Sequence, residues 1–322
     1  MLNLALGASS IEQIRLMLIH ANATSPLRTA IIGLDMESFL DAGRTDFDPA
    51  ALRGNPESEP EELVRLRIDV SREAFSASLA RLYAPASRER AEPPDAQSRA
   101  LSDSLLKDYD GQRGLIWVAE FSNFYGRLPY LFPQWTRATR WDTDRQRAAA
   151  MTAFRGLLDY ARREHIELKM FISPVHARYL EWYQRLGWWP LFEAWKHALV
   201  DAIHAESRTA AGRPAFTLWD FSGFHALATE PVPRLGDHAT RMRWYRDTSH
   251  YSPALGNLVL ERVLGRPAPD GSPLPDARID RVTIDDNLSS IRTGALEYRI
   301  SQPAEAANVS EMMIYLRRVA RK

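Results

Sequence analysis

The chain has 322 residues, of which 45% are hydrophobic and 25% are charged, a composition that indicates a globular protein of one or two domains. Its 41 basic residues balance 41 acidic ones, which argues against nucleic acid or an anionic membrane surface as the main partner. The chain has no cysteine, which excludes disulfides, a thiol nucleophile and thiolate metal sites, and no apolar run approaches the roughly 18 residues of a membrane span.

The first 35 residues predict a β-α-β unit. Residues 2–6 form an apolar strand pattern, a helical stripe begins at Ile11, and residues 29–35 form a second apolar strand. Two strands joined by a helix imply a parallel sheet. Between the first strand and the helix, Ser9 is predicted either as the N-cap of a capping box with Glu12 or as the serine of a G-x-S nucleophile motif.

Later segments extend the same scheme. Helices are predicted at 143–164 and 176–206, and strands at 166–172 and 215–219. Residues 41–142 predict a helical and irregular insertion that acts as a lid or substrate-facing subdomain. We therefore expect an α/β core made of residues 1–40 and 143–266. Residues 267–322 predict a linker rich in proline and aspartate and a C-terminal tail with a short helix at 309–321.

Polar residues follow each predicted strand. In open parallel sheets, ligands bind beyond the carboxyl ends of the strands, so these side chains are expected to converge there. They are Gly7, Ser9, Gly33, Asp35, Ser173, His176, Asp220 and Ser222. Of these, His176 is predicted either to bind substrate or to be a polar turn residue.

The segment Asp247-Thr248-Ser249-His250 carries the clearest chemical signal. An aspartate three residues before a histidine can fix the tautomer of the imidazole and stabilise its protonated form while the ring takes a proton from a hydroxyl nucleophile. Ser252 and Pro253 follow as a predicted N-cap and first helical residue, so His250 would stand just before a helix. The alternative is that Asp247 and His250 only form a turn.

An aromatic cluster between the third and fourth strands has two interpretations. It can form a platform on which sugar rings stack, or it can belong to the core. Its members are Tyr179, Trp182, Tyr183, Trp188, Trp189, Phe192 and Trp195. No His/Asp/Glu group has metal-ligand spacing and no glycine-rich phosphate loop is present, so neither a metal nor a cofactor is implied.

Three blocks together resemble the SGNH hydrolases, the GDSL-like esterases and acyltransferases, and especially their branch in exopolysaccharide modification at the cell envelope. Asp247 and His250 match the family's D-x-x-H, the strand Asn3–Gly7 resembles its N-x-x-x-G block, and Gly33-Leu34-Asp35 stands where G-x-N is expected. The resemblance implies a three-layer α/β/α, flavodoxin-like sandwich with a parallel sheet and a helical insertion. It also implies that Gly7 contributes its N–H to an oxyanion hole.

The chain departs from the family at two places. Asp35 replaces an asparagine that donates to the oxyanion, and an ionised carboxylate cannot donate; one lost donor costs on the order of 10²–10³ in rate. The spacing of Gly7 and Gly33 matches the family's second and third blocks, so the nucleophile block is expected upstream of Met1, with Ser9 as the alternative. An export signal would lie there too, which would place the protein in the periplasm or cell envelope; otherwise it is cytoplasmic.

Two functions follow as expectations. The first is a serine esterase or O-acyltransferase acting on an acylated saccharide or small molecule, with His250 as general base, Asp247 as its orienting carboxylate, and Gly7, Asp35 and His176 near the oxyanion and substrate. The second is a non-catalytic saccharide-binding or assembly protein on a degenerate SGNH-like scaffold. The absent nucleophile block and Asp35 favour the second.

Overall fold

The structure is a computed structural model that describes most of the chain outside its N-terminus and the long insertion. The described residues are 9–40, 113, 116, 117, 120, 145–209, 212–234, 237, 239–266, 274, 275 and 277–319, and the side chains of 315–319 are not described. The predicted strand at 2–6, Gly7 and nearly all of the predicted insertion at 41–142 therefore lie outside the described residues.

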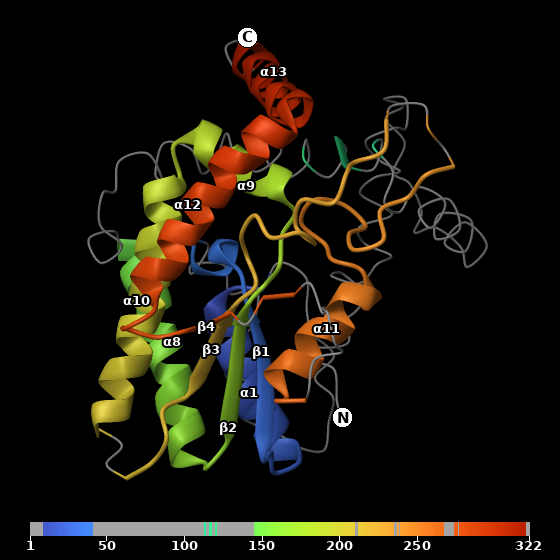
Figure 1. Cartoon of the computed structure of the whole chain (residues 1–322). Helices are drawn as coiled ribbons and strands as arrows, with labels where there is room; N and C mark the ends of the chain where they lie inside the picture. The colour runs from blue at the N-terminus through green and yellow to red at the C-terminus, as the bar shows by residue number, and fades with distance from the viewer. Residues whose placement is uncertain are drawn as a thin grey trace, which may run out of the picture.

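Four strands form one sheet in the order β1-β2-β3-β4 (Figure 1). They are β1 (Thr29–Leu34), β2 (Glu167–Ile172), β3 (Thr217–Asp220) and β4 (Arg278–Ile279). The first three are parallel and β4 is antiparallel to β3, which confirms a mixed α/β fold. The register places the last residue of β1 opposite that of β2, and that of β2 opposite the last residue of β3, so the three carboxyl ends form one edge.

Helices cover both faces of the sheet. On one face lie α1 (Ile11–Thr24), α8 (Arg145–Arg163), α9 (Ala177–Leu186) and α10 (Trp189–Thr209), and on the other lies α11 (Pro253–Val263) (Figure 1). The alternation of strand side chains produces this division, because neighbouring residues point to opposite faces.

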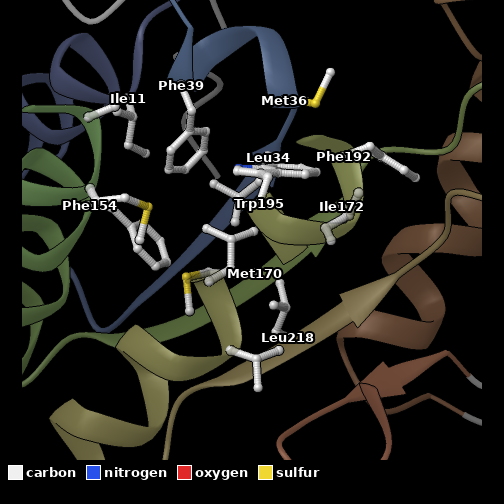
Figure 2. Packing of buried hydrophobic residues seen from close by; sticks show 14 of the residues in the cluster. Ile11, Leu34, Met36, Phe39, Phe154, Met170, Ile172, Phe192, Trp195 and Leu218 are labelled. Carbon is white, nitrogen blue, oxygen red and sulfur yellow. The ribbon is translucent and has the colours of Figure 1, made fainter. Parts of the chain in front are cut away.

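The two faces of β2 show how the core is divided. Met170 and Ile172 pack into the larger core cluster with the side chains of α8 and α10 (Figure 2). Phe171 packs with Trp219 against the α11 side. The aromatic cluster of the sequence analysis belongs to the larger core, since its seven members are between 0 and 8% exposed. The core interpretation of that cluster is therefore correct in this structure.

One predicted helix is in fact two. The segment 176–206 divides into α9 and α10 at Gly187, which has φ +77° and caps α9 in the left-handed conformation. A residue without Cβ adopts this conformation at little cost, and Pro190 then occupies the start of α10, where its missing N–H is not needed.

The N-cap of α1 also differs from the prediction. Ser10, not Ser9, accepts the hydrogen bond that caps the helix, from the backbone N–H of Gln13, and the Gln13 side chain accepts from the N–H of Ser10. The capping box therefore begins one residue later, with a glutamine in place of Glu12. Ser9 precedes it as a buried residue.

The C-terminal region is more structured than predicted. Instead of a linker followed by a short helix at 309–321, the chain adds β4 to the sheet and then forms α12 (Ile284–Ser301) and α13 (Pro303–Val319). The buried residues of α12 recur every three or four positions and pack into the larger core, a helical period that the sequence already contained. The division of the chain into domains stays a prediction.

Candidate functional site

Asp247 and His250 lie at the tip of a short hairpin that leads into α11. Tyr245 and Tyr251 form an antiparallel bridge, and the N–H of Arg246 donates to the carbonyl of His250 at 2.9 Å. The hairpin ends at Ser252, whose hydroxyl caps α11 as predicted. These bonds fix the shape of the hairpin, and the N–H of His176, four residues after the end of β2, donates to the carbonyl of Thr248 and holds the hairpin near the sheet edge.

The two side chains form the orienting pair that the D-x-x-H pattern predicted. His250 Nδ1 lies 2.7 Å from Asp247 Oδ2, while Asp247 Oδ1 accepts from the N–H groups of Ser249 at 2.8 Å and His250 at 3.0 Å. The Asp247 side chain is 5% exposed and that of His250 is 60% exposed. A buried, hydrogen-bonded carboxylate thus holds an imidazole whose side chain is largely exposed.

The pKa shifts of the pair agree with this geometry. The charge of Asp247 is the largest influence on His250 and raises its pKa above the usual value, although burial acts in the opposite direction. Burial opposes ionisation of Asp247, but the charge of His250 and the hydrogen bonds together lower its pKa. Because Asp247 accepts at Nδ1, the neutral ring carries its proton there, and Nε2 has the lone pair that a general base needs.

Asp35 lies beside this pair, at the carboxyl end of β1. Its carboxylate accepts a hydrogen bond from the hydroxyl of Ser173, which follows β2, and interacts electrostatically with His250. The residue is exposed, yet surrounding protein withdraws the carboxyl group from bulk water. That desolvation, followed by the charge of Glu37, raises the pKa of Asp35 to about 6. The structure therefore brings Asp35 and the D-x-x-H pair together.

A cavity of about 20 Å³, enough for roughly one water molecule, lies next to Asp35. Its polar lining consists of Asp35, Glu37, Ser173, Tyr183 and Ser222. Glu37, in the 3₁₀ helix η1 (Met36–Phe39), accepts hydrogen bonds from the hydroxyls of Tyr179 at 2.7 Å and Tyr183 at 2.5 Å. The carboxyl edge of β1 and β2 is therefore a polar recess set in an aromatic core.

Sequence reasoning missed a buried cluster at the end of β3. Lys196 Nζ, from α10, lies 2.6 Å from Asp220 Oδ2 and donates to Ser222 Oγ at 2.8 Å; Ser222 Oγ in turn donates to Asp220 Oδ1 at 2.6 Å. The Lys196 and Asp220 side chains are both 0% exposed. The sequence placed Asp220 at the sheet edge but did not identify its partner. The one signal available was a charged residue, Lys196, within the apolar stripe of a helix.

His176 is held by the backbone rather than turned toward solvent. It is 0% exposed and is the N-cap of α9; Nδ1 accepts from the N–H of Arg178 at 3.2 Å, and Nε2 lies 2.8 Å from the carbonyl of Glu230. Burial lowers its pKa to about 4, so the ring is neutral near pH 7 and its Nε2–H donates to that carbonyl. Its own N–H donates to the carbonyl of Thr248 at 2.9 Å, which ties it to the segment that carries His250.

A second ionic cluster braces the same region. Arg178, with a side chain 0% exposed, donates to both carboxylate oxygens of Glu120 at 3.0 and 2.8 Å and to Glu305 of α13 at 2.5 Å. Arg113 pairs with Glu305 and donates to the carbonyl of Pro233 at 2.6 Å. The cluster joins α9 and α13 to Arg113, Glu120 and the carbonyl of Pro233. No local pattern in the sequence predicted this long-range arrangement.

Two predicted site residues, Ser9 and Gly7, precede α1 in the sequence. Ser9 is 8% exposed and directly precedes the N-cap of α1. Gly7 lies outside the described residues. Among the described residues, no group of three or more His, Asp or Glu side chains is arranged to hold a metal ion. None of the described helices combines the length and the apolar character that crossing a membrane requires.

Comparisons with known proteins were made at three levels. The chain matches no family model, no curated protein and no solved structure. The functional assignment therefore depends on the geometry of the site and on the sequence blocks themselves.

Proposed function

We propose that the chain is an SGNH-like serine esterase or O-acyltransferase that acts on an acylated saccharide, with His250 as general base and Asp247 as its orienting carboxylate. One observation carries the proposal: a buried carboxylate holds Nδ1 of an exposed imidazole at 2.7 Å, at the carboxyl edge of a parallel sheet. Helices on both faces of the sheet and the Asp-x-x-His segment before α11 support the SGNH-like interpretation.

The proposed chemistry follows from the two ring nitrogens. Nδ1–H donates to Asp247, so Nε2 takes the proton of an attacking hydroxyl as the carbonyl carbon of the ester is attacked. The negative charge of Asp247 stabilises the imidazolium formed in that step, and the proton is then given to the leaving oxygen. Burial keeps Asp247 in place, whereas the His250 side chain is 60% exposed.

The hydroxyl of the activated serine must come within hydrogen-bond distance of Nε2. Ser249 does not meet this requirement, because its hydroxyl lies 3.1 Å from Nδ1 and donates to Asp247 at 2.9 Å. Ser249 therefore belongs to the orienting side of the pair. Ser9, in its G-x-S context, remains the candidate within this sequence, and a serine upstream of Met1 is the alternative.

The test combines ester hydrolysis with active-serine labelling. We expect the 322-residue chain, if Ser9 is the nucleophile, or the form extended by the preceding reading frame, if the serine lies upstream, to hydrolyse p-nitrophenyl acetate and to react with a fluorophosphonate probe. His250→Ala should abolish both, while His204→Ala, on α10, should change neither. Mass spectrometry of the labelled peptide identifies the serine. Equal turnover in His250→Ala and the parent chain would refute the assignment.

A second function is favoured by one residue. Asp35 occupies the place of an oxyanion donor, and an ionised carboxylate cannot donate. This substitution suits a saccharide-binding or assembly protein on a degenerate scaffold. Saccharide binding that persists in Asp247→Ala, without any fluorophosphonate labelling of the parent chain, would support this second function over the first.

A further inference from the structure

The carboxyl ends of β1 and β2 place two polar side chains side by side. Leu34 pairs with Ile172 in the sheet, so the next residues, Asp35 and Ser173, are neighbours across the edge. The Ser173 N–H also donates to the carbonyl of Leu34 at 3.2 Å, and its hydroxyl donates to the Asp35 carboxylate. Asp35 is thus held in a fixed position.

The chemistry of this pair suits one kind of ligand group. An ionised carboxylate only accepts hydrogen bonds, and Ser173 uses one of the several acceptor positions that its two oxygens offer. Asp35 is exposed as a residue, although surrounding protein withdraws its carboxyl group from bulk water, so a ligand hydroxyl that takes one of the other positions replaces little water. A carboxylate here repels an oxyanion but binds a hydroxyl group strongly, since O–H···O⁻ hydrogen bonds are among the stronger ones in proteins.

The pair also stands next to the proposed general base. The charges of Asp35 and His250 influence each other's pKa. Burial first and the charge of Asp35 second raise the pKa of Tyr251, the residue after His250. The backbone also links the two places, because the N–H of His176, three residues after Ser173, donates to the carbonyl of Thr248 at 2.9 Å. A ligand that donates one hydroxyl to Asp35 therefore has neighbouring atoms close to the imidazole of His250. A saccharide, with hydroxyls on adjacent carbons, meets both requirements.

We infer that Asp35 and Ser173 form an acceptor subsite, in which Asp35 binds one hydroxyl of a saccharide and so presents a neighbouring hydroxyl to His250 for acylation. The inference rests on the proposed function and deepens it, because it assigns the site to acyl transfer rather than to hydrolysis. Asp35 acts as a binding residue that selects the acceptor over water.

The transfer balances in two steps with one co-reactant, an oxygen-ester acyl donor. In the first step the oxygen of the activated serine bonds to the carbonyl carbon of the donor, the donor C–O bond breaks, and the serine proton passes through Nε2 of His250 to the leaving oxygen. In the second step the presented hydroxyl oxygen bonds to the carbonyl carbon of the acyl-serine, the acyl–Oγ bond breaks, and His250 carries the hydroxyl proton to the serine oxygen. Asp35 keeps its charge throughout and exchanges no proton with the reacting atoms.

The experiment measures how the acyl group divides between water and a sugar. The full chain is incubated with p-nitrophenyl acetate and methyl β-D-glucopyranoside, and acetylated glucoside and free acetate are quantified by mass spectrometry. We expect Asp35→Asn to lower the ratio of acetylated glucoside to acetate by roughly 10- to 100-fold, the effect of losing a hydrogen bond to a charged group. Ser173→Ala should lower it less, and Asp159→Asn, an exposed carboxylate on α8, should leave it unchanged.

Two results would overturn the inference. One is an unchanged ratio in Asp35→Asn. The other is faster p-nitrophenolate release in Asp35→Asn, which would show that an amide restores an oxyanion donor and that position 35 belongs to the oxyanion hole.

Failure of the proposed function gives a different result. If the parent chain releases no more p-nitrophenolate than His250→Ala, the proposed catalysis is wrong, and the subsite is then tested by saturation-transfer NMR with methyl β-D-glucopyranoside alone. Binding that Asp35→Asn abolishes and Asp159→Asn retains would keep the hydroxyl-binding subsite without the transfer step. The same signal in all variants, or none in the parent chain, would refute the subsite as well.

Discussion

The buried Lys196–Asp220 pair gives the sharpest prediction about stability. Lys196→Met removes the ammonium group but retains an unbranched side chain of similar length, and it leaves Asp220 with Ser222 as its neighbour in a fully buried site. A buried charge without its ionic partner typically costs 3–5 kcal/mol. Both side chains are 0% exposed, so water does not offset that cost. We expect a loss of about 3–5 kcal/mol in the free energy of unfolding.

Urea denaturation followed by tryptophan fluorescence measures this loss at pH 7. The matched variant is Lys196→Met combined with Asp220→Leu, which removes both charges; we expect it to recover most of the stability, since replacing a buried pair with apolar groups is often neutral. Arg281→Met, which removes one member of an ion pair with both side chains more than half exposed, should cost about 0–1 kcal/mol. A loss below about 1 kcal/mol in Lys196→Met would refute the burial of this pair.

Three further predictions concern titration and backbone conformation. Because the pKa of His176 falls to about 4 in the folded protein, the unfolded chain binds more protons between pH 4 and 6.5. The free energy of unfolding should therefore fall by roughly 2–4 kcal/mol on acidification across that range. His176→Asn removes the titrating ring and retains a capping residue, so urea denaturation of this variant should show less of the loss, and an unchanged pH dependence would contradict the prediction. Gly187→Ala should destabilise by about 1–2 kcal/mol through its positive φ alone, as nothing lies within 4 Å of the added methyl, and Gly212→Ala, with φ +78°, should cost a similar amount in the same assay. Removing a negative charge with Asp35→Asn should lower the pKa of His250, measured by NMR titration of its ring protons, and an unchanged or higher pKa would contradict the proximity of the two groups.

The elements that the sequence predicted well are those specified by local patterns. The strands at 29–34 and 167–172 are apolar runs next to helical stripes, and the cap of α11 follows from Ser252 and Pro253 alone. The Asp247–His250 pair is also local, since three residues of a hairpin suffice to bring its side chains together. In each case the interacting residues are close in sequence, so their spacing contains the information.

The failures have a different physical origin. Lys196 and Asp220 are 24 residues apart in the sequence. In the second ionic cluster, Arg178 lies 58 positions from Glu120 and 127 positions from Glu305. No periodicity predicts such pairs, because tertiary packing decides which polar group finds a partner. The helix α12 and the first turns of α13 were missed for a simpler reason. The apolar period of α12 was present, but a segment rich in proline and aspartate directed the interpretation toward a linker.

His176 shows how a correct placement can still suggest the wrong surroundings. The residue follows β2 as the sequence predicts, but its ring lies among backbone groups of the 221–250 segment, and the carbonyl of Glu230 and the N–H of Arg178 engage its two nitrogens. Its backbone N–H holds Thr248, between Asp247 and His250. The two histidines therefore contrast in environment: burial keeps His176 neutral, whereas the adjacent carboxylate of Asp247 raises the pKa of the exposed His250. Of the two, His250 alone combines an exposed side chain with an orienting carboxylate, the combination that the proposed proton transfer requires.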